Sequence, residues 1–233
     1  PVSEYAVECV IDELAERIGM DPVDFRLKNA AKEGTQTAYG PKFGPIGFVE
    51  VLEATKALDH YKIPLGPNQG RGIGSGFWFN IGGETCVNLN VNEDGTLTLI
   101  TGSPDIGGSR ASMCNMAAEE LGIDVGLINP IIADTSVLGF NFLSAGSRTT
   151  FACGLATIEA ARNAIENMRK RVAQLWDIPL DAVVWEDGAA RPASSNAGVF
   201  EPMTLPEIAK IAPKTGGPIA GHAEINAQGA GPG

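Results

Sequence analysis

Two short stretches of the sequence have the composition of an anion-binding turn. GGSRAS at residues 107–112 and AGSRTT at residues 145–150 both place Gly-Ser-Arg and hydroxyl residues at the predicted start of a helix. The first turn of a helix offers free backbone N–H groups and the positive end of the helix dipole, and arginine adds a guanidinium. Helix capping accounts for either turn alone, but two copies in a chain with only 17 basic residues favour phosphate or another anion.

The other residues that could do chemistry are predicted to be structural. GRGIGSG at residues 70–76 has the glycines of a dinucleotide site, but no strand precedes it and no helix follows, so a packed glycine-rich strand is expected. Glu84 has no basic neighbour and is expected to face solvent or lie in a turn. His60 and His222 stand alone, so neither is expected to act in catalysis or to bind a metal, and no metal site is predicted. The sequence has no nucleophile elbow, which leaves hydrolase chemistry weakly supported.

The composition argues against two classes of partner. A net charge of -11 disfavours a nucleic-acid backbone or an anionic membrane, and 44% hydrophobic residues are enough for a globular core. No apolar run reaches the length of a membrane span and no signal peptide begins the chain. Both ends look cut from a longer protein, so a targeting signal of the parent is not observable; the expected location is cytoplasmic. The cysteines are far apart without a CxxC motif and are predicted to be reduced, buried thiols: Cys9, Cys86, Cys114 and Cys153.

The elements that would position the two turns divide the chain into two parts. Residues 1–62 are predicted to be a helical lead-in, because apolar side chains recur every three or four positions. Asp21 and Pro22 have the chemistry of a helix start within it. Residues 70–233 mix extended and helical patterns, and the whole chain is predicted to be part of one domain that is cut at both ends.

Residues 70–233 contain a clear hairpin signal. Apolar and polar side chains alternate over residues 85–91 and 96–100, and Asp94-Gly95 lies between them. The order of elements predicts an α+β fold, sandwich-like, with helices packed on a mixed or antiparallel sheet. The remaining predicted elements are a helix ending at Leu121, a buried strand over 127–135, a long helix over 148–176, a hairpin over 182–192, a short helix over 204–212 and an extended tail.

The sequence resembles one family in several separated motifs. SEYAVECVIDELAERIGMDPVDFRLKNAAKEG at the start resembles a segment of the molybdopterin-binding subunits of the xanthine dehydrogenase and aldehyde oxidase family. The resemblance keeps its order and spacing over roughly residues 3–170. Its further parts are VNEDGTLTLITGSPDIGGSRASMCNMAAEELGI at 91–123, ADT at 133–135, GSRTTFACGLATIEAARNAI at 146–165 and the strand entry GHAEINAQGAGPG at 221–233.

The resemblance implies that both turns contact a pyranopterin cofactor, molybdopterin, which is commonly a dinucleotide form in bacteria. Many members of the family have Gly-Gln-Gly where this chain has GGSR, so the first turn departs from their pattern. The cofactor-binding residues that the resemblance implies are Gly107, Gly108, Ser109, Arg110 and Ser112 in the first turn, and Gly146, Ser147, Arg148, Thr149 and Thr150 in the second.

The function that the resemblance implies is that of a fragment of a molybdenum hydroxylase, an oxidoreductase. The parent enzyme would use a catalytic glutamate and pass electrons to iron–sulfur and often flavin partners. Both the loop beside the molybdenum and the glutamate are expected outside residues 1–233, so no catalytic residue is assigned and the isolated chain is expected to be inactive. Aldehydes, purines, other heteroaromatics and carbon monoxide all remain open as substrates.

Two alternatives remain open from the residues themselves. The chain could be a non-catalytic anion-binding or assembly domain, a homodimer through the long helix for example, in which the two turns bind whatever anion is available. The second and weaker alternative is a phosphate-handling enzyme. Molybdenum and pterin in the full-length parent would distinguish a molybdenum hydroxylase from both alternatives.

Overall fold

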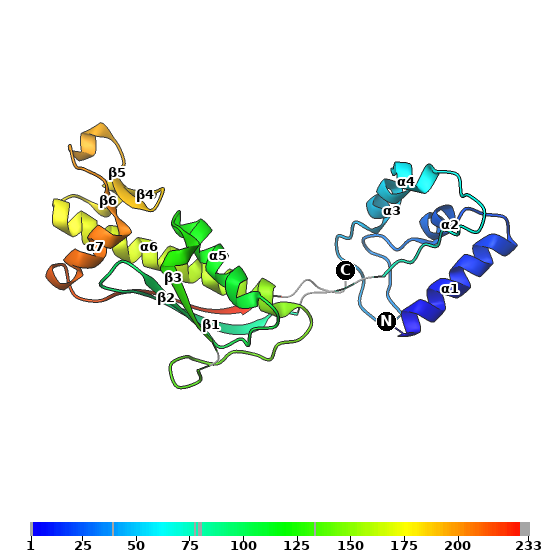
Figure 1. Cartoon of the computed structure of the whole chain (residues 1–233), viewed down its shortest axis with the longest axis horizontal. Coiled ribbons are helices and arrows are strands. Elements are labelled where there is room, and N and C mark those ends of the chain that lie inside the picture. Colours follow the sequence, from blue (N-terminus) through cyan, green and yellow to red (C-terminus); the bar gives the residue numbers. More distant parts are fainter. Residues whose placement is uncertain (1, 39, 77, 79–80, 133, 229–233) are drawn as a thin grey trace. The chain divides into compact units, whose positions relative to one another are not determined.

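The computed structural model describes residues 2–38, 40–76, 78, 81–132 and 134–228. The chain divides between residues 79 and 80 into two compact units, which are described one at a time (Figure 1). We call them the helical unit, before this boundary, and the α+β unit, after it. Within the described residues, no helix has the length and apolar character needed to span a bilayer.

The helical unit follows the predicted capping pattern at its second helix. Asp21 accepts hydrogen bonds from the backbone N–H groups of Val23 and Asp24, and Pro22 occupies the first helical turn, where a missing N–H costs nothing. The helical pattern of residues 46–61 predicts one helix, but the structure has two, because the backbone leaves the helical conformation at Leu58 (φ −59°, ψ 138°). The helices of this unit are α1 (Val2–Arg17), α2 (Pro22–Asn29), α3 (Phe48–Ala57) and α4 (Asp59–Lys62).

A buried arginine holds the helical unit together. The side chain of Arg26 is 3% exposed and bonds Glu8 at 2.7 Å and Asp12 at 2.8 Å. Arg26 also donates to the carbonyl of Ile73, and the N–H of Ser75 donates to Glu8. The predicted glycine-rich strand is therefore wrong: the stretch forms no strand and is fixed by Arg26 and Glu8 instead of by a neighbouring strand.

This network predicts an acid-sensitive contribution from Glu8. Burial raises the pKa of Glu8, but hydrogen bonds from the Ser75 N–H and from Arg26 outweigh it, so the pKa lies below its ordinary value of 4.5. Because folding lowers the pKa of Glu8, its contribution to stability is fully present above the unfolded-state pKa. It is lost as the pH falls through the folded-state pKa. Glu8→Gln should lower the free energy of unfolding by about 2 kcal/mol near neutral pH and by progressively less in acid.

Urea denaturation of both proteins from neutral pH to about pH 3 checks this. Glu13→Gln is the matched control, because Glu13 lies on the same helix in an exposed pair with Arg17. If the free energies of unfolding of wild type and Glu8→Gln differ by the same amount at every pH, folding does not favour the charged form of the Glu8 carboxylate.

The α+β unit contains a four-stranded mixed sheet in the order β3-β2-β1-β7. β1 pairs antiparallel with β2 and with β7, while β2 and β3 are parallel. A smaller antiparallel sheet has the order β4-β5-β6. The elements are β1 (Gly83–Val91), β2 (Leu97–Thr101), α5 (Ser109–Leu121), β3 (Ile128–Ile132), a π-helical turn (Thr149–Cys153), α6 (Gly154–Trp176), β4 (Val183–Glu186), β5 (Ala189–Pro192), β6 (Met203–Thr204), α7 (Leu205–Ile211) and β7 (Ile219–Ala227), with 3₁₀ turns at Val125–Leu127, Leu180–Ala182, Ser195–Ala197 and Ala212–Lys214.

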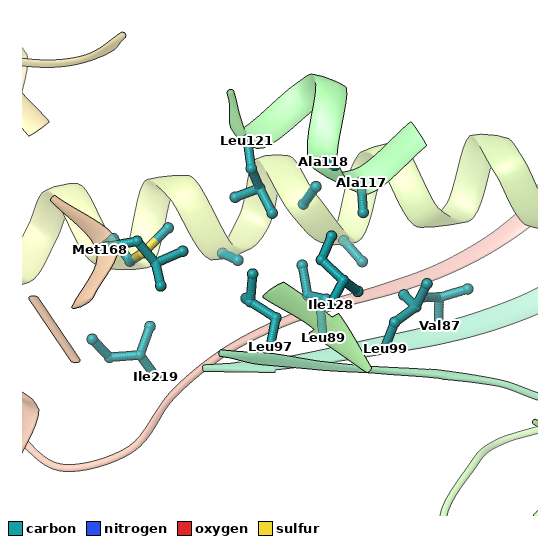
Figure 2. Packing of buried hydrophobic residues seen from close by; sticks show 14 of the residues in the cluster. Val87, Leu89, Leu97, Leu99, Ala117, Ala118, Leu121, Ile128, Met168 and Ile219 are labelled. Carbon is teal, nitrogen blue, oxygen red and sulfur yellow. The ribbon is translucent and has the colours of Figure 1, made fainter. Parts of the chain in front are cut away.

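The core of the α+β unit lies between one face of the large sheet and the helices α5 and α6 (Figure 1). In Figure 2 the side chains of the strands point toward those of the two helices. Small residues let α6 approach β7 closely: a Cβ on Gly221 would lie 2.0 Å from the carbonyl oxygen of Ala160. The labelled core residues are Val87, Leu89, Leu97, Leu99, Ala117, Ala118, Leu121, Ile128, Met168 and Ile219.

The predicted α+β fold with helices on a mixed sheet is confirmed. The Asp94-Gly95 hairpin is present, with Gly95 at φ +85° and Asp94 accepting a hydrogen bond from the N–H of Thr96. The second hairpin and the short helix α7 also form as predicted. Parts of the expected strand over 127–135 and of the tail, residues 133 and 229–233, lie outside the described residues.

All four cysteines are free thiols, as predicted. Three of them are buried and lie in the α+β unit: Cys86, Cys114 and Cys153. Cys9 is exposed on α1, so the expected burial is wrong for this residue. The reason is that α1 buries only Ala15, and apolar side chains such as Leu14 and Ile18 stay exposed.

Candidate functional site

The second Gly-Ser-Arg turn enters the long helix through a strained backbone. Gly146 and Ser147 both have positive φ, +56° and +59°. A Cβ on Gly146 would lie 2.2 Å from the side chain of Ile81, whose N–H donates to the Gly146 carbonyl at 2.9 Å. A non-glycine residue at φ +59° is uncommon and marks a turn that the surrounding structure holds in place. The Ser147 backbone is therefore held in a defined turn just before the helix.

Arg148 is fully buried and is used within the chain. Every nitrogen of its guanidinium donates a hydrogen bond to the chain itself. The acceptors are the carbonyls of Gly82 at 2.8 Å, Phe142 at 2.8 Å, Leu143 at 3.4 Å and Glu84 at 2.9 Å, and the hydroxyl of Thr85. Arg148 therefore ties the turn to β1 and acts as a positioning residue, and its expected contact with a cofactor stays a prediction.

A pocket of about 710 Å³ opens beside this turn. One wall of the pocket is polar and includes Thr149 and Thr150, which begin the π-helical turn. Backbone N–H groups at the start of a helix have no carbonyl one turn earlier with which to form a helical hydrogen bond. The other wall is apolar and comes from α5 and α6. The residues that line it are Ile106, Met116, Ser147, Thr149, Thr150, Phe151, Gly154, Leu155 and Ile158.

The first Gly-Ser-Arg turn differs from the second because it already holds a carboxylate. Asp105 accepts hydrogen bonds from the N–H groups of Gly108 at 3.0 Å and Arg110 at 3.3 Å, and from the Ser109 hydroxyl at 3.2 Å. The N–H of Gly108, followed by that of Arg110, lowers the pKa of Asp105. The Arg110 guanidinium lies 3.5 Å from the same carboxylate. The anion at the start of α5 is thus part of the chain, and an external anion has to compete with it.

The second turn lines the pocket with three residues of the predicted set, whereas none of the predicted residues of the first turn lines it. Ile106, one residue before the predicted set, lines the pocket together with Ser147, Thr149 and Thr150. Gly107 has φ +79° and open space where a Cβ would lie. Of the remaining predicted residues, Gly108, Ser109 and Arg110 bond Asp105, and Ser112 donates its hydroxyl to the Gly108 carbonyl.

The apolar wall is the part of the site that sequence reasoning missed. Phe151, Leu155 and Ile158 belong to the predicted long helix, where an apolar stripe is normally assigned to the core. One signal was available in Gly154, because glycine inside a helix is unfavourable without a packing reason. A Cβ at this position would lie 2.6 Å from the Met116 sulfur, so Gly154 lets α5 and α6 meet beside the pocket.

Comparison with known proteins gives one consistent family. A family model described as molybdopterin cofactor-binding domain matches residues 53–231. The chain is similar to a putative xanthine dehydrogenase molybdenum-binding subunit of Escherichia coli, with 31% identity over 178 residues, 69% of this chain and 24% of the relative. It is also similar to an aldehyde oxidoreductase of Megalodesulfovibrio gigas, with 28% identity over 73% of this chain and 20% of the relative.

Solved structures show the same fold. CO dehydrogenase from Oligotropha carboxidovorans aligns with a TM-score of 0.73 and 18% identity, over 96% of this chain and 32% of that chain. At this identity the likeness concerns the fold. The chain spans 24% or less of the length of the two curated relatives named above.

Proposed function

Because the chain belongs to the family of molybdopterin cofactor-binding domains, we propose that its parent protein is a molybdenum hydroxylase and that the pocket beside α6 forms part of the cofactor site. The observation that carries this proposal is the pocket itself. It is bounded by the residues of one predicted turn and by Ile106 next to the other, and it is large enough to take part of a cofactor.

The residues around the pocket fit the chemistry of a pyranopterin that carries phosphate. The hydroxyls of Ser147 and Thr150, at the start of the π-helical turn that precedes α6, suit a phosphate. The apolar side chains of Phe151 and Leu155 suit a ring system. Ser144 and Thr149 share a hydrogen bond of 2.5 Å, which fixes the position of the Thr149 hydroxyl.

The chain's own part in the reaction is to bind and orient. Bound molybdopterin would supply the redox chemistry, while the protein fixes its position. None of the pocket-lining residues in the described part of the chain has a titratable side chain. This supports the assignment of proton transfer to a glutamate of the parent protein outside residues 1–233.

Partners and substrate are proposed at the level of class. The relative from Escherichia coli is named as a molybdenum-binding subunit, which implies other subunits beside it. We assign iron–sulfur and flavin subunits or domains as partners of the parent protein, since electrons have to leave the molybdenum after each turnover. The substrate would be a small molecule with an oxidisable carbon, such as an aldehyde or a heteroaromatic ring.

Cofactor extraction from the purified full-length parent tests this proposal. The expected result is molybdenum together with a fluorescent pterin after oxidation, and oxidation of an aldehyde or heterocycle with an artificial electron acceptor. A folded parent protein with neither molybdenum nor pterin would contradict the proposal and favour a non-catalytic anion-binding domain.

A further inference from the structure

A cysteine, a histidine and a glutamate come together on the large sheet away from the pocket. Cys86 on β1 and Glu224 on β7 are paired across the two strands, and His222 is two residues before Glu224 on the same face. One potential ligand atom from each of the three residues lies within 4.8 Å of the other two. Val87, which points to the opposite face, is fully buried in the core under α6, so this trio lies on the face that α6 does not cover.

The spacing of the trio suits a tetrahedral metal ion. His222 Nε2 and Glu224 Oε1 are 3.5 Å apart. Zinc–nitrogen and zinc–oxygen bonds of about 2.1 Å at a tetrahedral angle place such atoms about 3.4 Å apart. A thiolate, an imidazole and a carboxylate are all ligands that zinc accepts, whereas Mg²⁺ and Ca²⁺ prefer sites made of oxygen.

Asn88 supports His222 in the way that metal-binding histidines are supported. Nδ1 of His222 lies in hydrogen-bond contact with Oδ1 of Asn88, and Nδ2 of Asn88 donates to the carbonyl of Val137 at 3.4 Å. The amide thus presents its oxygen to Nδ1 of the ring and leaves Nε2 as the nitrogen that faces the Glu224 carboxylate, where both atoms can bind a metal ion. A second hydrogen bond that fixes the tautomer is typical of metal-ligating histidines.

The trio can be reached from solvent on one side. Gly139 packs beside the trio, and a Cβ there would lie 3.4 Å from the Cys86 sulfur and 3.6 Å from Glu224 Oε1. Cys86 is 3% exposed, while the side chains of His222 and Glu224 are 51% and 72% exposed. An ion can therefore reach the thiol from the side of the two exposed ligands, and one coordination position stays open to water.

We propose that Cys86, His222 and Glu224 form a zinc(II) site with Asn88 as the residue that orients the histidine. The site is independent of the proposed function, because none of its residues lines the pocket beside α6.

Titration of the reduced 233-residue chain with Co²⁺, a spectroscopic probe for zinc sites, tests the proposal. One equivalent of Co²⁺ should produce tetrahedral ligand-field bands and a thiolate-to-cobalt charge-transfer band, and Zn²⁺ should displace it. Cys86→Ser and His222→Gln should lose the charge-transfer band or weaken binding at least about tenfold. Asn88→Ala should weaken Zn²⁺ binding about 10–100-fold, and Asn88→Asp, which keeps the acceptor oxygen, should restore it.

The chain offers matched controls. Cys9→Ser and His60→Gln remove the exposed cysteine and the other histidine, and both variants should bind like wild type. Circular dichroism shows whether each variant is folded; His222 is exposed, so His222→Gln is expected to fold even if Cys86→Ser does not. Absence of a thiolate band in the folded wild-type chain, or equal binding by His222→Gln and His60→Gln, would overturn the proposal.

Discussion

Replacing Arg148 with methionine is expected to lower the free energy of unfolding of the α+β unit by about 4 kcal/mol. The reason is the set of backbone carbonyls that Arg148 satisfies, those of Gly82, Glu84 and Phe142. Methionine fills a similar volume but donates nothing, and each buried acceptor left without a partner costs about 1–3 kcal/mol. Urea denaturation followed by circular dichroism measures the change.

Two further variants separate the hydrogen bonds from the charge. Arg162→Met removes an arginine of α6 whose side chain is 55% exposed and pairs with Glu120 and Glu159, so it should lower the free energy of unfolding far less than Arg148→Met. Arg148→Lys keeps the charge but not the planar geometry of the guanidinium, so its destabilisation should lie between those of Arg162→Met and Arg148→Met. Equal destabilisation by Arg148→Met and Arg162→Met would contradict the role assigned to Arg148.

The second large effect is expected at the crossing of β7 and α6. A Cβ on Gly221 would lie 2.0 Å from the carbonyl oxygen of Ala160 and 2.7 Å from the backbone nitrogen of Ala164. Backbone atoms of a helix cannot rotate away as a side chain can, so the strand or the helix has to shift. Gly221→Ala should therefore destabilise the chain by about 3 kcal/mol, at the upper end of the cost of overpacking.

Gly72→Ala is the control for this prediction. It makes the same chemical change at a glycine where a Cβ would meet nothing within 4 Å, so it has the same effect on the unfolded chain without the collision. Thermal denaturation compares the two variants with wild type. A melting temperature for Gly221→Ala equal to that of Gly72→Ala would show that β7 and α6 are less closely packed than the structure indicates.

Local patterns were sufficient to predict most of the elements. Asp94-Gly95 requires a tight turn because glycine supplies the positive φ and aspartate accepts from the backbone, and both effects act within a few residues. The stretch at residues 70–76 shows the opposite case. Its composition suggested a strand, but a strand needs a partner, and its hydrogen bonds go to Arg26 and Glu8, residues far away in the sequence.

The two arginine turns show why the site was only partly predictable. Arg110 and Arg148 have the same neighbours in sequence, yet Arg110 is exposed and Arg148 is fully buried. The partners of Arg148 are backbone carbonyls, which every residue possesses and no sequence pattern marks. The carboxylate of Asp105, in contrast, lies three residues before the N–H of Gly108 that it accepts from, so that cap could have been recognised.

The same reasoning applies to the proposed zinc site. Cys86 and Glu224 are distant in the sequence and become neighbours only through the antiparallel register of β1 and β7. Alternation along each strand then decides that Cys86 and Glu224 share a face. Neither the pairing nor the register follows from the sequence around the residues, which is why each residue looked isolated.

The molybdenum content of the full-length parent carrying Leu155→Trp tests most directly whether the pocket beside α6 belongs to the cofactor site. Leu155 is 39% exposed and lines the pocket, while Leu175, on the same helix and 49% exposed, does not line it. If the pocket holds part of the cofactor, Leu155→Trp should lower the ratio of molybdenum to protein about tenfold or more, and Leu175→Trp should leave it at the wild-type value. Wild-type molybdenum content in a folded Leu155→Trp protein would contradict this assignment.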